Sequence, residues 1–247
     1  VRLAVCPLFV SGEEQMNIEL LHHTEHPEQT VALAARLCYS PSGLEELKDK
    51  INSSDTRQFI DKIMSLGHHS VLEHASFTFG VEGIARGTSH QLVRHRVASY
   101  SQQSQRYVSH VERFDAVVPP SVAADEEAKR IFDFTVGVVH QAYSQLIEMG
   151  IQPEDARYLL PNATETKIII TMNARELLHF FKLRCCERAQ WEIRAMAVGM
   201  LKLAKEVAPT LFRDAGPGCI SGPCPEGDLC CGQTAKVRKQ FRSLSHG

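Results

Sequence analysis

KIIITMNARELLHFFKLR, residues 167–184, contains the clearest strand-to-helix transition in the chain. Three consecutive isoleucines at 168–170 are β-branched and apolar, so KIIITM, residues 167–172, predicts a buried strand. Asn173 then offers a side-chain oxygen for a helix N-cap, and Glu176 follows at the capping-box spacing. A helix is predicted over about 174–183. Because the chain shows no regular βα alternation, this transition indicates an α+β fold.

Further strands and helices are predicted on both sides of this segment. ASFTFGVEG alternates Phe77, Phe79 and Val81 with smaller or polar residues, which predicts a strand over 75–82 with one buried face. Another strand is predicted over 2–8. PEQTVALAARL, residues 27–37, has Pro and Glu in the first turn expected of a helix. Other helices are predicted over 54–66, where Ser54 or Asp55 caps the start and Gly67 ends it, over 153–160 and over about 188–206.

The longest predicted helix runs from about Val122 to Met149. Its apolar side chains recur every three to four residues, at Ile131, Phe134, Val138, Ala142 and Leu146. Gly150 and Pro153 end it. These elements together predict a mixed or antiparallel sheet packed with helices, one of them long.

The composition changes from Asp214 onward. Gly, Pro and Cys dominate DAGPGCISGPCPEGDLCCGQ, residues 214–233, and no helical or strand period is visible in this tail. We therefore expect a single domain over residues 1–213 and a Gly/Pro/Cys-rich C-terminal extension over 214–247 that lies outside the main core.

Composition and charge exclude several classes of protein. The chain has 247 residues, 43% of them hydrophobic and 23% charged, with a net charge of −2. An intrinsically disordered chain lacks that apolar content, and a protein that coats nucleic acid needs a large positive excess. No run of about 18 apolar residues occurs, so no membrane span is expected. The N-terminal residues show no secretory pattern, so we expect a cytoplasmic protein whose eight cysteines are reduced thiols.

RHRVASYSQQSQRY, residues 94–107, is the densest cluster of polar groups. Its three arginines, Arg94, Arg96 and Arg106, alternate with hydroxyl and amide side chains. Guanidinium groups bind phosphate or carboxylate through paired donors, so the segment suits a polyanionic ligand. A solvated basic surface loop is the alternative interpretation of the same string.

Two other clusters contain chemically useful residues. NARELLHFFKLR places Asn173 and Arg175 at a helix N-terminus, which favours anions, and places His179 on the face of Arg175. GHHSVLEHASF contains His68, His69, Glu73 and His74, but their spacing does not gather a zinc ligand set on one helix face, so structural or ligand-stacking histidines are favoured. Neither a GxGxxG nor a GxxxxGK[ST] phosphate cradle is present.

The 94–107 segment resembles the RHRxxSxNxxSxR motif of flavin-dependent thymidylate synthases. Every fixed position matches except one, where Ser101 stands in place of the usual Asn. A hydroxyl replaces only part of the hydrogen bonding of an amide. The resemblance extends to LGHHSVLEHASFTF, DARYLLP and NARELLHFFKLRCCERAQWEIR, and covers roughly residues 28–212.

The resemblance implies reductive methylation of dUMP to dTMP, with methylenetetrahydrofolate as carbon donor, FAD as cofactor and NADPH as reductant. It implies a catalytic domain of α+β fold and a homotetramer with shared active sites, with small-molecule substrates and neither nucleic acid nor membrane as partner. By position, the implied FAD contacts are His68, Ser70, Arg94, His95, Arg96, Gln102, Asn173, Arg175 and His179. The implied dUMP contacts are Gln91, Arg94, Gln102, Gln103, Ser104, Gln105, Arg106, Arg157 and Arg184.

Arg184 is the predicted catalytic residue. At the N3/O2 edge of uracil it would stabilise an N3-deprotonated base and push electron density toward C5. Ser104 has neutral glutamines beside it and no base, so we assign it to phosphate binding rather than to nucleophilic attack.

Three alternative interpretations remain open. A non-catalytic RNA-binding module would need a basic domain with stacking aromatics, against a net charge of −2 and 7% aromatic content. A thiol oxidoreductase would need a CxxC beside a βαβ unit. No bound metal is predicted. The alternative is a structural zinc site formed by Cys219, Cys224, Cys230 and Cys231, although their spacing is not of the paired CxxC type.

Overall fold

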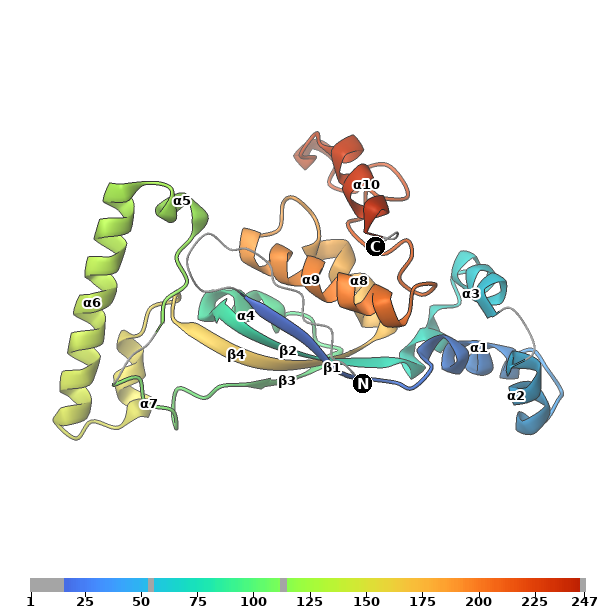
Figure 1. Ribbon diagram of the computed structural model, residues 1–247, viewed down its shortest axis with the longest axis horizontal. Helices are drawn as coiled ribbons and strands as arrows, with labels where there is room; N and C mark the ends of the chain where they lie inside the picture. Colours follow the sequence, from blue (N-terminus) through green and yellow to red (C-terminus); the bar gives the residue numbers. More distant parts are fainter. Residues whose placement is uncertain (1–15, 53–55, 112–114, 245–247) are drawn as a thin grey trace.

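The computed structural model describes residues 16–52, 56–111 and 115–244. Their centre is a four-stranded sheet in the order β1-β2-β4-β3 (Figure 1). Every neighbouring pair is antiparallel, and the strands are β1 (Asn17–His23), β2 (Ser76–Ala85), β4 (Glu165–Asn173) and β3 (Ala98–Gln102). The predicted α+β class and the predicted strands over 75–82 and 167–172 are confirmed. The strand predicted over 2–8 lies outside the described residues.

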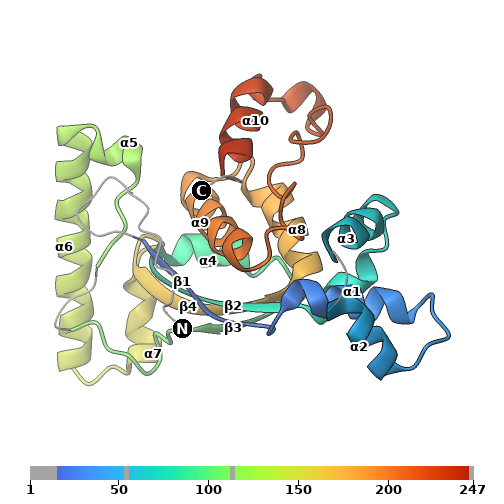
Figure 2. The same ribbon diagram turned by 45° about the vertical axis from the view of Figure 1, so that its right-hand side comes forward.

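The sheet buries one face and leaves the other open. In β4, Ile168, Ile170 and Met172 are buried in the hydrophobic core, whereas Ile169 is 46% exposed. The predicted buried strand is therefore buried on only one of its two faces. The helices α8 (Ala174–Arg184) and α9 (Trp191–Val207) lie over one face of the sheet in both views (Figure 1, Figure 2). An antiparallel sheet can expose its second face, and a run of isoleucines does not show which of its members point outward.

The helix α8 follows β4 directly. The side chain of Asn173 accepts a hydrogen bond of 2.9 Å from the backbone N–H of Glu176, which confirms the predicted N-cap. Leu177, Phe180 and Phe181 are buried beneath the helix. Both predicted helices of this region are confirmed, and α4 (Arg86–Leu92) joins them on the core after β2.

A group of short helices lies beyond one end of the sheet (Figure 1). It comprises α1 (Pro27–Leu37), α2 (Leu44–Asn52), α3 (Thr56–Ser65) and the 3-10 helix η1 (His69–His74). The helix predicted over 27–37 is confirmed. The helix predicted over 54–66 is present as α3 and is followed by Gly67, whose φ of +73° suits glycine, while its predicted cap residues lie outside the described part.

The long helix begins later than predicted. The segment 122–149 divides into α5 (Pro120–Ala123) and α6 (Glu126–Glu148), because the Asp125 side chain accepts a 2.9 Å hydrogen bond from the Ala128 N–H and starts a new helix. The helix α6 stands at the edge of the molecule (Figure 1). Its predicted apolar face is exposed, at 55% for Ile131, 72% for Phe134 and 50% for Val138. The predicted segment 153–160 forms α7 (Pro153–Ala156) and the 3-10 helix η2 (Arg157–Leu159).

The C-terminal segment contributes to the core. It contains the 3-10 helix η3 (Gly227–Leu229) and α10 (Thr234–Ser243), and Cys219, Val237 and Phe241 belong to the main hydrophobic cluster. The expectation of a tail without helical period outside the core is therefore wrong. Val237, Phe241 and Leu244 form a narrow apolar stripe that the basic residues around them obscured. A division of the chain at residue 213 stays a prediction.

None of the described helices is both long and apolar enough to cross a membrane.

Candidate active site

His95, which is buried, lies at the centre of a polar group between the α4–β3 connection and α8. The hydroxyl of Tyr100 lies 2.9 Å from the Leu92 carbonyl oxygen and 2.8 Å from that of His95, which fixes the turn before β3. Burial, and then the charge of Glu176, raise the pKa of Tyr100, so its hydroxyl stays protonated and acts as a donor to these carbonyls. The turn therefore holds the His95 ring in one place.

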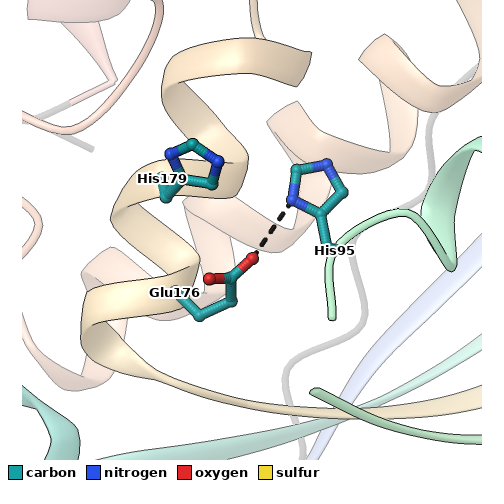
Figure 3. Close-up of side chains that lie close together, drawn as sticks. All are labelled: His95, Glu176 and His179. Carbon is teal, nitrogen blue, oxygen red and sulfur yellow. Dashed lines mark hydrogen bonds and ion pairs between the residues drawn. The ribbon is translucent and has the colours of Figure 1, made fainter. Parts of the chain in front are cut away.

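The His95 imidazole has a different partner at each nitrogen. Nδ1 lies 3.2 Å from Oε1 of Glu176, and Nε2 lies 3.1 Å from Nε of Arg184. Figure 3 shows His95 and Glu176 facing each other, with His179 one turn along α8 from Glu176. His95 is only 4% exposed, and its ring centroid lies 5.8 Å from that of His179.

The surroundings of His95 keep it neutral. Burial is the main cause that lowers its pKa from 6.5 to about 4, and the charges of Arg184 and His179 lower it further. Burial likewise raises the pKa of Glu176 and lowers that of Arg184.

Arg184 ends α8 and is held at two points. Besides its Nε contact with His95, its Nη2 donates to the backbone oxygen of Gln91 at 3.3 Å. The sequence-predicted residues Gln91, His95, His179 and Arg184 therefore come together in this central group, although Gln91 and Arg184 are 93 residues apart.

The same group has the composition of a metal site. Ligand atoms of His95, Glu176 and His179 all lie within 4.8 Å of one another. However, the Arg184 guanidinium contacts His95 Nε2 and brings a positive charge beside it, which opposes a cation there. In the other histidine cluster, His68 pairs with Tyr39, whose hydroxyl lies 2.6 Å from its Nδ1, and the side chains of His69 and His74 are exposed.

A second group of charges surrounds Glu154. Its Oε2 accepts from Nε of Arg106 at 2.7 Å, and its backbone oxygen accepts from Nε of Arg157 at 3.0 Å. Arg86 donates to the backbone oxygen of Gln103 at 3.2 Å. Burial, and then the nearby charge of Arg157, lower the pKa of Arg86. Guanidinium groups crowded in this way favour an anionic ligand.

The polar residues of β3 and of the turn after it border this second group. Ser104 Oγ accepts from the Arg106 N–H at 3.2 Å, and Gln102 Nε2 donates to Thr166 Oγ1 at 3.2 Å. The side chains of Ser104 and Gln105 are half-buried.

A third group lies where η1 meets the start of α8. Arg175 donates from Nη1 to Oε1 of Glu73 at 2.5 Å, and His68, just before η1, and Ser70, within it, are exposed. Arg94 and Arg96, in the turn before β3, are exposed as well. These residues present cationic and hydroxyl groups at the surface of a single chain.

Two cavities in the described part of a single chain do not join the three groups. A cavity of about 840 Å³ lies elsewhere, beside α9 and α10, and one of about 420 Å³ lies on the open sheet face near Ser101 and Gln103. Arg157 and Arg184 belong to different groups. These groups are linked by α4, on which Arg86 and Gln91 are five residues apart, a rise of about 7.5 Å. That Arg94, Arg157 and Arg184 all contact dUMP, as the family resemblance implies, stays a prediction for the assembled protein.

The described cysteines form no disulfide. Cys224 and Cys230 interact through their side chains, and the Gly232 N–H lies 3.4 Å from Cys230 Sγ, an interaction that lowers the pKa of the Cys230 thiol. Among the described residues, the four candidate zinc ligands do not form a group whose ligand atoms all lie within 4.8 Å of one another. Metal analysis of protein purified without chelator tests the zinc alternative.

Three residues of these groups were not predicted from the sequence as site residues. Glu176 was expected only as a capping residue, although its carboxylate faces His95. Glu154 lies three residues before Arg157, which was the available signal for it. Arg86 follows the predicted strand over 75–82 after a short gap, and nothing in its local sequence marks it as a site residue.

Comparison with known proteins shows the family. Residues 19–210 match the family model described as thymidylate synthase complementing protein. A Geobacter sulfurreducens protein named flavin-dependent thymidylate synthase is 63% identical over 231 residues, which are 93% of this chain and 100% of the relative. Proteins of the same name from Clostridium tetani and Pyrococcus furiosus are 47% and 42% identical, over 92% and 93% of this chain and 97% and 98% of theirs. The chain therefore belongs to the flavin-dependent thymidylate synthase family.

Proposed function

We propose that this protein converts dUMP to dTMP by flavin-dependent reductive methylation, a methyltransferase reaction. Methylenetetrahydrofolate would be the carbon donor, FAD the cofactor and NADPH the reductant. Family membership supports the reaction, and the observation that carries the proposal for this chain is the partly buried arginine Arg184, held by His95 and Gln91 at the edge of a cation-rich surface.

The residues of the chain fit FAD. Its diphosphate needs several donors, and without a glycine-rich cradle these must come from side chains such as Arg94, Arg96 and Arg175, which are exposed. The start of α8, capped by Asn173, adds backbone N–H groups and a favourable dipole. When bound, FAD supplies the electron transfer. We assign the remaining predicted contacts, His68, Ser70, Gln102 and His179, to holding and orienting it. His95 is buried with both ring nitrogens engaged, so it would support the site from within the fold.

The same residues fit dUMP. The Arg86–Arg106–Arg157 group and the Ser104 hydroxyl can hold the phosphate. Gln103 and Gln105 lie in the same segment and can complete the phosphate contacts. Arg184 and Gln91 would meet the uracil edge, where the guanidinium stabilises negative charge at N3 and O2 and so makes C5 more nucleophilic.

The purified protein itself tests the proposal. We expect it to be yellow, with flavin absorbance that NADPH bleaches, and to oxidise NADPH faster when dUMP is present. Formation of dTMP from dUMP and methylenetetrahydrofolate is the decisive measurement. A colourless protein that binds RNA would support the RNA-binding alternative, and a protein that reduces disulfides would support the oxidoreductase.

Ser104→Ala should weaken dUMP binding and leave turnover. The variant loses one hydrogen bond from a neutral hydroxyl to phosphate, so we expect KM for dUMP to rise about tenfold. We expect kcat at saturating dUMP to stay within a factor of about three of the wild-type value. Initial rates across a dUMP series measure both. A complete loss of turnover at saturating dUMP would mean that Ser104 is the nucleophile.

We also propose that the protein is a homotetramer with active sites shared between copies. Two surfaces have no partner in the described part of one chain: the open sheet face and the apolar face of α6. The helix α6 exposes Ile131, Phe134 and Val138. Arg94, Arg96 and Arg175 are exposed in the single chain and line neither of the two cavities described above, so a neighbouring copy could complete their site.

Phe134→Asp should dissociate the assembly. Phe134 is 72% exposed in the single chain, so a carboxylate there is tolerated by the monomer but costs several kcal/mol when an apolar interface covers it. Light scattering after gel filtration should show a smaller species than wild type. The control is Leu66→Asp, at a leucine that is 58% exposed near the end of α3. An unchanged mass in the Phe134 variant would exclude α6 from the interface.

A further inference from the structure

The Glu176 carboxylate is used in a way that helix capping does not require. Glu176 stands at the capping-box position, three residues after the N-cap residue Asn173, and its backbone N–H is already bonded to the Asn173 side chain. Its carboxylate lies 3.2 Å from Nδ1 of His95, across the interface between α8 and the turn before β3 (Figure 3). The side chain of Glu176 is 11% exposed and that of His95 is 3% exposed, so the contact is shielded from water.

The partners of the His95 ring determine where its proton resides. Arg184 Nε always carries hydrogen, so its 3.1 Å contact with His95 Nε2 requires a lone pair on Nε2. A neutral imidazole then carries its single proton on Nδ1, and this proton points at the Glu176 carboxylate. Glu176, His95 and Arg184 therefore form one directional chain of hydrogen bonds.

This chain orients the guanidinium of Arg184. Two of its five N–H groups are committed, one to His95 and one to the Gln91 carbonyl. These two contacts fix the plane of the fork and leave the two N–H groups of Nη1 and one of Nη2 for a ligand. If the imidazole proton moved to Nε2, two N–H groups would face each other and Arg184 would lose this support.

We propose that Glu176 is a positioning residue, which holds His95 in its Nδ1–H tautomer so that His95 Nε2 fixes the Arg184 guanidinium against the substrate base. The inference rests on the proposed function for its catalytic consequence, whereas the tautomer and the chain of hydrogen bonds stand on the geometry alone.

Glu176→Gln is the informative substitution. The amide keeps the shape of the carboxylate, but it can either accept from Nδ1–H or donate to an unprotonated Nδ1, so it no longer selects one tautomer. We expect kcat for dTMP formation to fall about 100-fold, as for a catalytic group displaced by about 1 Å, with bound flavin retained and KM for dUMP within about threefold.

The control is Asp61→Asn. Asp61 lies on α3, away from the three polar groups, and forms a bidentate pair with Arg213. The variant therefore removes a carboxylate from a carboxylate–guanidinium pair without touching the site. We expect its kcat to match wild type. The variant His95→Gln supplies a second control, because adding Glu176→Gln to it should lower kcat no further if Glu176 acts only through His95.

The histidine tautomer provides a readout that a purely structural role would not move. In protein labelled with ¹⁵N-histidine, we expect the His95 resonances, assigned by their loss in His95→Gln, to show protonated Nδ1 and unprotonated Nε2. In Glu176→Gln we expect a shift toward the Nε2–H form.

Two results would overturn the inference. One is an Nε2–H tautomer in the wild-type protein, which is informative even if the variant does not fold. The other is a folded Glu176→Gln variant with wild-type kcat. If the wild-type protein forms no dTMP, the proposed function fails while the tautomer measurement still decides whether the hydrogen-bonded chain exists.

Discussion

Replacing Arg184 by alanine should abolish dTMP formation and leave the flavin bound. Arg184 is the predicted source of positive charge at the uracil edge, and its guanidinium is already oriented by His95 and Gln91. Removing one preorganised donor from a dry site typically costs 10²–10³ in rate, and here a full charge is lost as well, so we expect a decrease of at least about a thousandfold.

The measurement separates chemistry from binding. Flavin content by absorbance and dUMP binding by calorimetry should change far less than the rate of dTMP formation. Arg188→Ala is the matched control, because Arg188 lies four residues further along the chain, in the segment between α8 and α9, and its guanidinium bonds to the Leu229 carbonyl oxygen at 2.8 Å. Wild-type turnover in Arg184→Ala would remove Arg184 from the mechanism. Loss of turnover in both variants would point to a shared structural effect.

Acidification should destabilise the protein through His95. Its pKa is about 4 in the folded protein against 6.5 for an ordinary histidine, so protonation favours the unfolded chain. His95 therefore contributes fully to stability above pH 6.5, and this contribution is lost as the pH falls from 6.5 to about 4. Each pKa unit corresponds to about 1.4 kcal/mol, so the decrease in the free energy of unfolding approaches about 3 kcal/mol. Solvent screening does not reduce this value, because the side chain is buried.

Urea unfolding at pH 7 and pH 4.5, at one protein concentration, measures the effect. His110 also has a lowered pKa, caused mainly by burial, and it adds a loss of the same sign. The comparison with His95→Gln, which cannot titrate, isolates the contribution of His95. We expect the variant to lose less stability on acidification than wild type does. Equal losses in the two proteins would mean that His95 is not held neutral.

The sequence predicted best what is encoded over short distances. The β4–α8 transition needed only an apolar run and an asparagine at the cap, and both act within a few residues. The helix of residues 27–37 was predicted for the same reason. The motif match also identified His95, His179 and Arg184, which the structure brings together.

What the sequence did not predict depends on contacts between distant segments. Glu176 and His95 are 81 residues apart, and Arg106 and Glu154 are 48 apart, so no local pattern connects them. The apolar face of α6 was detected, but its exposure in the single chain was not, because periodicity does not specify what covers a face. The buried stripe of α10 is too narrow to be distinguished among its charged neighbours.

The absence of a linker between β4 and α8 affects how the site can move. The last residue of the strand, Asn173, is also the cap of the helix, so α8 and its terminal Arg184 are joined rigidly to the sheet. A hinge is therefore not available on that side. Whatever else moves when substrates bind, the arginine at the end of α8 serves as the fixed reference against which the substrate is aligned.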